Sequence, residues 1–313
     1  MKQPCDLELA ISVMERRLAY ICQGAGSLSG GLERINAAGG KRLRPTLAWI
    51  CWRLAGAKNR IVPLMCMLEL MHTASIIHDD LVDNALFRRG TVTISAKEGA
   101  QAAVQSGDYL LSRAMELLET YRGTGINEYL SRVSEIMSLG ELKQQENLYN
   151  TAALSQEKYF DYINAKTAVF IAESCRCGAL AASNDGDICD SLYNFGLSLG
   201  RVFQMKDDYT DLKIGEEGAK PKLSDLENGV ITLPMIIACE KYGDILKLLL
   251  SKREKSEIEI SYIAELLENS GALETTAEYI RREGKAAAEA LDSLPDSLEK
   301  HALTLLAAEI SEV

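Results

Sequence analysis

The sequence lacks any long hydrophobic run. No uninterrupted apolar stretch reaches the roughly 20 residues that a membrane-spanning helix needs. Residues 1–18 mix acidic, basic and apolar side chains and do not resemble a signal peptide. A cytoplasmic location is therefore expected. Disorder is excluded in turn, because 47% of the residues are hydrophobic.

Positive charge and paired cysteines are also scarce. Against 45 Asp and Glu there are 34 Lys and Arg, a formal net charge of −11, which argues against a broad nucleic-acid or anionic-membrane surface. An anionic substrate would need local cations. None of the 8 cysteines stands in a CxxC pair, so we expect reduced core thiols. Cys175 and Cys177 could bind a soft metal, but with no further ligand nearby a coincidence on one helix face is favoured.

Proline is rare, with 6 residues in 313, and apolar residues recur three and four positions apart over most of the chain. This period predicts an all-α protein. Length alone would suit two domains, but no Pro-, Gly- or Ser-rich joint and no fixed-period repeat is present, so we expect a single domain over residues 1–313. The predicted helices span 7–23, 29–38, 43–57, 61–84, 95–119, 126–150, 156–182, 187–213, 230–250, 256–269, 273–290 and 295–311.

One charged, glycine-containing segment, Lys213–Gly229, breaks the helical pattern. We predict a mobile loop there. A solvated helical connection is the alternative, and the periodicity does not separate the two.

Two DDxxD motifs each end an apolar helix. They comprise Asp79, Asp80 and Asp83, and Asp207, Asp208 and Asp211. On a helix the first and last aspartate of each motif lie on one face, so each motif offers two parallel carboxylates with a third beside them. Oxygen ligands without nearby thiols favour Mg²⁺ over Zn²⁺.

The alternative is a pair of solvated helix ends. Carboxylates at a helix C-terminus are unfavourable because of the helix dipole, and like charges about 4 Å apart repel by a few kcal/mol. Two such clusters call for a bound cation, and local conflicts of this kind mark functional sites. Basic residues also gather near the motifs, with glycines that would let the backbone approach a diphosphate. They are Lys41, Arg42 and Arg44, Arg88 and Arg89, and Lys166.

The spaced motifs of the chain resemble one known family. GGKRLRP, HTASIIHDDLVDNALFRRG, SGDYLLSRA, GELKQQ, AKTAVF, FQMKDDYTD and DLENGVITLP follow one another between about Leu32 and Pro234. They resemble the trans-isoprenyl diphosphate synthases, also called polyprenyl synthetases. The resemblance implies the all-α isoprenoid synthase fold, a helical bundle around a central catalytic cavity, and usually a homodimer. It also implies head-to-tail condensation of isopentenyl diphosphate with an allylic diphosphate.

The resemblance also implies roles for single residues. The first motif would hold two Mg²⁺ and the second a third, with Asp79, Asp83 and Asp207 as ligands. Arg88, Lys166 and Lys220 would contact the allylic diphosphate, and Lys41, Arg44, His72 and Arg89 would bind isopentenyl diphosphate. Without the family, His72 would be read as a core histidine. Thr167 and Gln204 would line the path of the reacting carbons, with Glu141 and Gln144 shaping its wall.

The segment after the second motif departs from the family. Two glycines of a GKxxGxD pattern are replaced by Ala219 and Leu223, and a later lysine becomes Val230. Lys222 would substitute for the missing charge. These changes bear on loop closure and allylic affinity, whereas Val92 in place of the usual proline is a minor change.

Product length is predicted from the helix that carries Asp79. The product tail would run antiparallel to it, toward Ala74 and Ser75, then Met71, then Met67. Because the first two are small, growth past farnesyl is allowed and a long-chain product is favoured. The methionines would form the floor of the tunnel or simply fill the core.

Three alternatives remain open at this point. A terpene cyclase would use the same ionisation, but the intact second motif and the Lys41, Arg44 and His72 set argue against it. A non-catalytic subunit is disfavoured by both acidic motifs, while the catalytic half of a heterodimer is compatible with them.

Overall fold

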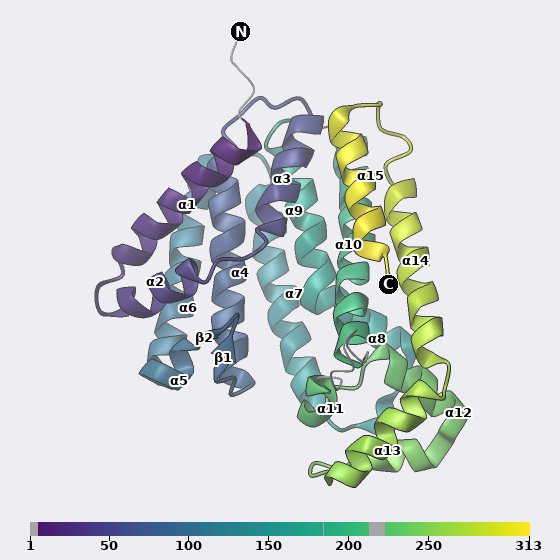
Figure 1. Cartoon of the computed structure of the whole chain (residues 1–313). Coiled ribbons are helices and arrows are strands. Elements are labelled where there is room, and N and C mark those ends of the chain that lie inside the picture. Colours follow the sequence, from purple (N-terminus) through teal and green to yellow (C-terminus); the bar gives the residue numbers. More distant parts are fainter. Residues whose placement is uncertain (1–5, 184, 213–222) are drawn as a thin grey trace. The chain divides into compact units, whose positions relative to one another are not determined.

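Helices make up most of the computed structural model, which describes residues 6–183, 185–212 and 223–313 (Figure 1). The α-helices are α1 (Leu7–Gln23), α2 (Ser29–Ala37), α3 (Leu43–Leu54), α4 (Val62–Val82), α5 (Ile94–Glu98), α6 (Ala100–Leu118), α7 (Ile126–Asn147), α8 (Gln156–Ile163), α9 (Val169–Leu180), α10 (Gly186–Leu212), α11 (Ser224–Asn228), α12 (Leu233–Leu250), α13 (Glu257–Glu268), α14 (Ala272–Glu289) and α15 (Leu298–Ser311). Short strands β1 (Phe87–Arg88) and β2 (Thr91–Val92) form one antiparallel hairpin. Within the described residues, no helix is both long and apolar enough to cross a membrane.

The helical prediction is confirmed along most of the chain and corrected at four places. The predicted helix 95–119 breaks at Gly99, whose φ of 92° is unfavourable for other residues. The predicted helix 156–182 contains a π-helical turn, Asn164–Ala168. The predicted helix 230–250 begins at Leu233 and is interrupted at Gly243. Within the predicted loop 213–229, residues 224–228 form α11.

The first of two compact units comprises Met1–Leu130 and Ser174–Asp190. Its central helix is α4, which packs against α1, α3 and α6 (Figure 1). Pro63 lies in the first turn of α4, where its missing N–H costs nothing. Residues 63–71 of α4 are all buried, as expected for a helix that is apolar on every side. This burial fixes the C-terminal end of α4, which carries the first acidic motif.

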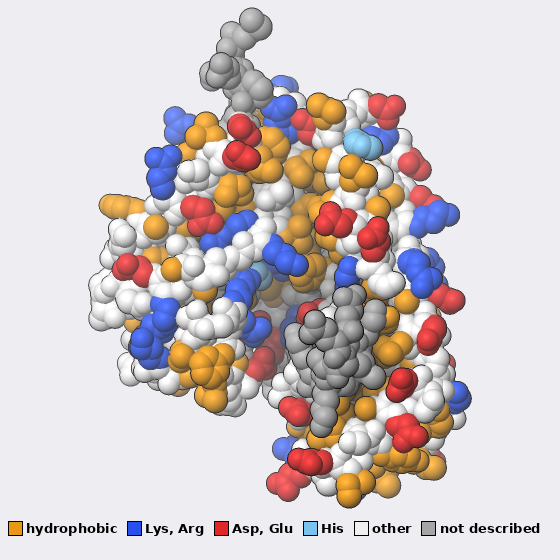
Figure 2. Space-filling model, in the orientation of Figure 1, with side chains coloured by type: hydrophobic (Ala, Val, Ile, Leu, Met, Phe, Trp, Pro, Cys, Tyr) orange, Lys and Arg blue, Asp and Glu red, His pale blue; other side chains and the backbone are white. Residues whose placement is uncertain are grey.

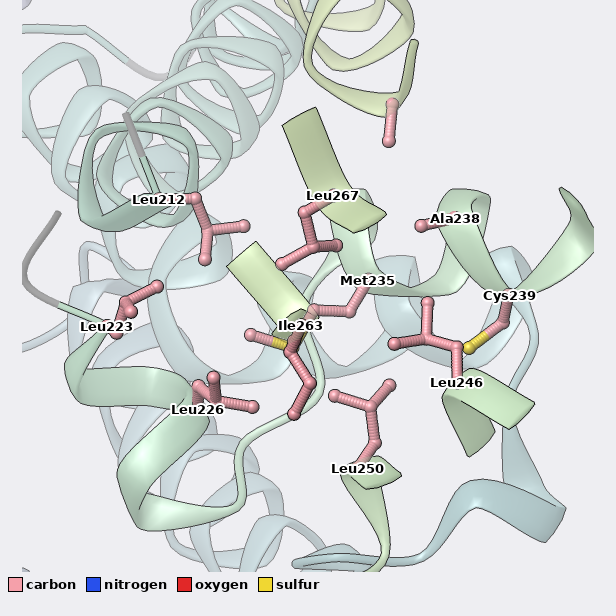
Figure 3. Close-up of a cluster of buried hydrophobic side chains, with 11 residues drawn as sticks. Leu212, Leu223, Leu226, Met235, Ala238, Cys239, Leu246, Leu250, Ile263 and Leu267 are labelled. Carbon is pink, nitrogen blue, oxygen red and sulfur yellow. The ribbon is translucent and has the colours of Figure 1, made fainter. Parts of the chain in front are cut away.

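The second unit comprises Ser131–Glu173 and Ser191–Val313. Its core joins α12 and α13 to the last residue of α10, Leu212, and to Leu223 and Leu226 at α11 (Figure 3). The apolar contacts thereby hold the end of the second acidic motif. Over α14 and α15, charged side chains of both signs alternate with apolar ones at the surface (Figure 2).

The cysteine prediction is confirmed for the described residues. Cys22, Cys51, Cys66, Cys175, Cys177, Cys189 and Cys239 are all buried and in no disulfide. They behave as small apolar core residues.

Candidate functional site

The three aspartates of the first motif lie in different environments at the end of α4. Asp83 is exposed and Asp79 half-buried, whereas Asp80 is 2% exposed. Arg88 Nε and Nη2 both lie 2.7 Å from Asp80 Oδ1. Burial raises the pKa of Asp80, and the Arg88 guanidinium opposes that shift. The central aspartate is thus fixed by an arginine, and the outer two are left toward the surface.

The hairpin after α4 brings Arg88 back onto Asp80. Its two turn residues, Arg89 and Gly90, have φ of 50° and 74°, and Arg88 pairs with Thr91 across the turn. A two-residue turn with both φ values positive matches the twist of the strands it joins. The sequence RRG contains this turn, although the helical analysis did not predict the hairpin.

A second group of basic side chains lies at the loop between α2 and α3. Burial lowers the pKa of Arg44 to about 10, Glu69 opposing and Arg89 adding to the shift. His72, on α4, also has a lowered pKa because of burial and then because of the positive charges around it. Those charges belong to Arg44, Arg89, Arg42 and Arg88. His72 therefore lies among arginines, and three of the four residues predicted to bind isopentenyl diphosphate are near one another. The fourth, Lys41, is exposed on the same loop.

In the second motif, Asp208 is the centre of a hydrogen-bond chain. It is 3% exposed, accepts from Tyr159 Oη at 2.6 Å and accepts from Gln204 Nε2 at 2.8 Å. Thr167 Oγ1 donates to Gln204 Oε1 at 2.7 Å. Burial raises the pKa of Asp208 to about 6, while the Tyr159 and Gln204 hydrogen bonds lower it. Thr167 and Gln204, predicted together from the family, do lie in contact.

Asp211 caps α11. Its Oδ1 accepts from the Ser224 backbone N–H at 3.2 Å and from the Ser224 hydroxyl, and its Oδ2 accepts from the Asp225 N–H at 3.1 Å. These bonds satisfy backbone donors that the first turn of a helix leaves open. Asp207 and Asp211 lie four residues apart on α10, as the motif predicts, and the Asp211 carboxylate also binds the start of α11. Asp207 is exposed.

Asp225 joins this acidic group, and sequence reasoning missed it. Its pKa is raised to about 8, first by burial and then by the nearby charges of Asp208, Asp211 and Asp207. The only signal in the sequence was its place in a motif that departs from the family pattern.

Lys166 and Thr167 lie in the π-helical turn between α8 and α9. Such turns are rare and occur often at functional sites. Two glycines let neighbouring helices approach this turn: a Cβ on Gly140 of α7 would lie 2.8 Å from Ala165 Cβ, and one on Gly200 of α10 would lie 2.5 Å from Ala168 Cα.

The Lys166 ammonium is held by side chains of α7 and α8. Its Nζ donates to Gln144 Oε1 at 2.6 Å, lies 3.8 Å from Glu141 Oε2 and lies 5.6 Å from the Tyr162 ring centroid. Tyr162 Oη donates to the same Gln144 oxygen at 3.0 Å. Glu141 and Gln144, the weaker sequence candidates, thus position Lys166.

A cavity of about 540 Å³ borders this group. Gln144 and Tyr162 line it, together with Leu154, Ile231 and Val230. Where the family has a lysine, Val230 therefore contributes to an apolar wall. Leu223 has a left-handed φ of 53°, which the family glycine would adopt more easily. Lys220, Ala219 and Lys222 lie outside the described residues.

The predicted chain-length residues lie on α4. Ala74, Met71 and Met67 are buried, and the half-buried Ser75 donates its hydroxyl to the His72 carbonyl at 2.9 Å. Their role in product length stays a prediction.

The oxygen donors present fit magnesium. Among residues 6–183, 185–212 and 223–313, no three His, Cys, Asp or Glu side chains gather to hold an ion by themselves. Mg²⁺ is typically bound by one or two carboxylates completed by water and substrate phosphate. Asp79 with Asp83, and Asp207 alone, match that requirement.

A mostly helical chain with clustered carboxylates at the ends of two helices and clustered arginines has the features of an enzyme for metal-bound diphosphates. The family model described as polyprenyl synthetase matches residues 27–267. The chain is 31% identical over 306 residues to heptaprenyl diphosphate synthase component 2 of Bacillus subtilis (strain 168), covering 96% of this chain and 87% of that protein. It is 30% identical over 279 residues to octaprenyl diphosphate synthase of Escherichia coli (strain K12), covering 87% and 86%.

A solved structure extends the comparison to the fold. The polyprenyl synthase from Caulobacter crescentus CB15, complexed with calcium and isoprenyl diphosphate, matches with a TM-score of 0.90 and 32% identity, over 97% of this chain and 94% of that one. The chain belongs to the polyprenyl synthetase family, and it is a prenyltransferase.

Proposed function

We propose that the chain condenses isopentenyl diphosphate with an allylic diphosphate, head to tail, and releases diphosphate. One observation carries the proposal. In each acidic motif the central aspartate is buried and held by a polar partner, Asp80 by Arg88 and Asp208 by Tyr159, whereas Asp83 of the first motif and Asp207 of the second are exposed. That arrangement suits ions shared with a substrate.

Magnesium is the proposed cofactor, with two ions at Asp79 and Asp83 and a third at Asp207. When bound, it would neutralise the charge that develops on the departing diphosphate. The calcium in the Caulobacter crescentus relative supports a divalent ion beside an isoprenyl diphosphate.

The chain's own cations would divide between the two substrates. Arg88, Lys166 and Lys220 bind the allylic diphosphate, and Lys41, Arg44, His72 and Arg89 bind isopentenyl diphosphate. Arginine and lysine donors stabilise the leaving oxygens as the allylic C–O bond breaks and both its electrons move to the diphosphate. The double bond of isopentenyl diphosphate then attacks the allylic carbocation.

The last step returns the double bond. A proton leaves the carbon next to the new cationic centre and passes to the released diphosphate, so no protein base is required. Thr167 and Gln204 line the path of the reacting carbons, where the Thr167 hydroxyl is held by Gln204. Holding both substrates in place supplies much of the rate.

The product is a long-chain, all-trans polyprenyl diphosphate, in line with the heptaprenyl and octaprenyl synthases among the relatives. We take both units to act as one catalytic domain, because the family match runs through residues of each. A homodimer is proposed. The relative named as component 2 raises a heterodimer as the second possibility, with this chain as the catalytic subunit.

The test uses purified protein with labelled isopentenyl diphosphate, Mg²⁺ and each of dimethylallyl, geranyl, farnesyl and geranylgeranyl diphosphate, with products sized by chromatography. Mass measurement in solution is run on the same sample. Linear products longer than farnesyl are expected from a dimer. A cyclic hydrocarbon formed without isopentenyl incorporation would contradict the proposal, and activity that appears only with a second subunit would favour the heterodimer.

A further inference from the structure

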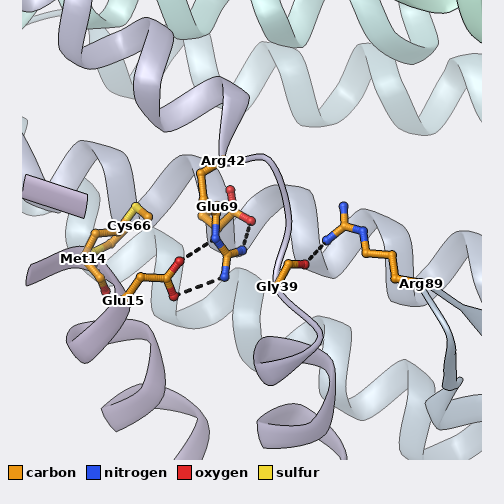
Figure 4. A network of polar contacts seen from close by, with 7 residues as sticks. All are labelled: Met14, Glu15, Gly39, Arg42, Cys66, Glu69 and Arg89. Carbon is orange, nitrogen blue, oxygen red and sulfur yellow. Dashed lines mark hydrogen bonds and ion pairs between the residues drawn. The ribbon is translucent and has the colours of Figure 1, made fainter. Parts of the chain in front are cut away.

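Arg42 is the last residue of the loop between α2 and α3, between Lys41 of the loop and Arg44 in the first turn of α3. Its side chain contacts two glutamates (Figure 4). Its Nε donates to Glu15 Oε1 at 2.6 Å and its Nη2 to Glu15 Oε2 at 3.1 Å. Its Nη1 donates to Glu69, a side chain that is 5% exposed on α4. A planar guanidinium bound at both edges has its position fixed in a way that a single contact does not achieve.

The backbone of this loop depends on such fixing. Arg42 has a left-handed φ of 48°, an unfavourable conformation for a residue other than glycine, which persists only where surrounding contacts enforce it. Arg89 Nη1 donates to the Gly39 carbonyl at the other end of the loop. A Cβ on Gly40 would lie 2.6 Å from that Nη1, so the glycine leaves room for the Arg89 guanidinium.

Charge distinguishes Arg42 from its neighbours. It contacts two carboxylates, one of them buried, so its own charge is balanced inside the protein. The same carboxylate of Glu69 acts on the buried Arg44 guanidinium and raises its pKa against the effect of burial. Glu15 and Glu69 together therefore balance the charge of Arg42 and fix its guanidinium.

We propose that Glu15 of α1, with Glu69 of α4, is a positioning residue for isopentenyl diphosphate: it holds Arg42, and through it the loop that carries Lys41 and the first turn of α3 that carries Arg44. The inference rests on the proposed function, which assigns that loop to this substrate. It extends the site to the first helix, outside the residues 27–267 that the family model matches.

The test is Glu15→Gln, which keeps the size of the side chain and removes its charge. We expect the Kd for isopentenyl diphosphate, measured by titration calorimetry, and its KM to rise about tenfold. The loss of one hydrogen bond to a charged group changes an equilibrium constant by about that factor or more. The KM for the allylic diphosphate should stay unchanged. Arg42→Lys, which keeps the charge but loses the two-edged contact, should act in the same direction.

Glu98→Gln is the matched control. It breaks the Arg34–Glu98 ion pair of 2.9 Å in the same unit without touching the loop, and both affinities should stay at the wild-type level. An unchanged Kd in Glu15→Gln, or an equal loss of affinity for both substrates, would overturn the inference. A wild-type protein that binds isopentenyl diphosphate but condenses nothing would count against the proposed function and leave the positioning result standing.

Discussion

Asp207 and Asp211 lie one helical turn apart but make different contacts. Asp207 is exposed on α10, whereas Asp211 has both oxygens engaged at the start of α11. A carboxylate that caps a helix stabilises the fold, and one that faces solvent contributes little to stability. The two residues should therefore separate activity from stability.

Asp207→Asn is expected to lower turnover by about 10²-fold or more, the scale of removing one group that stabilises transition-state charge. Its denaturation midpoint should match the wild type. Asp211→Ala should instead lower the free energy of unfolding by about 1 kcal/mol, as expected for a lost N-cap. Urea denaturation and the condensation assay measure both effects. Wild-type turnover in Asp207→Asn would be incompatible with its assignment as a ligand.

Asp225 gives a prediction about pH. Its pKa is raised to about 8 in the folded protein, from 3.8, so the folded state binds more protons than the unfolded state between about pH 4 and pH 8. This carboxyl therefore contributes stability at low pH that is lost as the pH rises through that window. Asp225→Asn abolishes the effect.

The measurement is the melting temperature of wild type and Asp225→Asn in chelator from pH 4 to pH 8.5. The melting temperature of the variant should rise relative to that of the wild type as the pH rises, with the largest change reached near pH 8. A constant difference across the range would show that Asp225 is ionised in the folded protein throughout.

The unequal roles of these aspartates could not be predicted from the motifs alone. DDxxD indicates which side chains lie near one another on a helix. The partner that buries Asp208 is Tyr159, 49 residues away, and the helix that Asp211 caps lies in a segment predicted as loop. Such contacts depend on the packing of distant elements, which periodicity does not contain.

At the scale of elements, the π-helical turn depends on close packing against α7 and α10. In a π-helical turn the backbone hydrogen bonds join residues five apart, one more than in an α-helix, so the side chains point in shifted directions. Lys166 and Thr167 lie in this turn. The contact with α10 requires glycine at position 200, because a Cβ there would lie 2.5 Å from the Ala168 backbone. The Ala168 backbone has little freedom to move away from an added Cβ.

Gly200→Ala should therefore lower both the free energy of unfolding, by about 1–3 kcal/mol, and the turnover number. Gly186→Ala, on the same helix, is the control, because a Cβ there meets nothing within 4 Å. Thermal melts and the condensation assay compare the two. If both variants behave alike, the turn does not depend on this close approach.

Most elements could be predicted from the sequence because an apolar face at helical period is a local property. The elements that were not predicted also have identifiable physical causes. Gly99 and Gly243 interrupt helices through backbone angles that periodicity cannot register, and the RRG hairpin is too short to show strand alternation. The π turn inserts one residue into a continuous apolar pattern, which looks the same as an uninterrupted helix.

At the scale of the whole molecule, the acidic balance of the chain hides a local excess of cations. The net charge is −11, yet four arginines surround His72 and lower its pKa. The composition argues against a general polyanion surface and predicts that an anionic substrate is bound by local cations. These cations come together because the β1–β2 hairpin contacts the α2–α3 loop, which lies about 50 positions earlier in the chain.

Product length is the property of the whole enzyme that a few side chains on α4 are predicted to set. Measured along the helix axis from Asp79, Ala74 lies about 7.5 Å away and Met67 about 18 Å away, at 1.5 Å per residue. Ala74→Phe should block the tail early and give a short product, while Met67→Phe should change the length only of long products. Both positions are fully buried, so the melting temperature is recorded for each variant.

Met65→Phe is the matched control for Met67→Phe. Met65 lies on the same helix and is equally buried, but two residues along a helix turn the side chain by about 200°, away from the face of Met67, Met71 and Ala74. Chromatography of products from farnesyl diphosphate should show the wild-type distribution for Met65→Phe and an altered one for Met67→Phe. The same change of product length in Met65→Phe and Met67→Phe would mean that α4 affects the product through packing. An unchanged product in Ala74→Phe would show that this face of α4 does not line the tunnel.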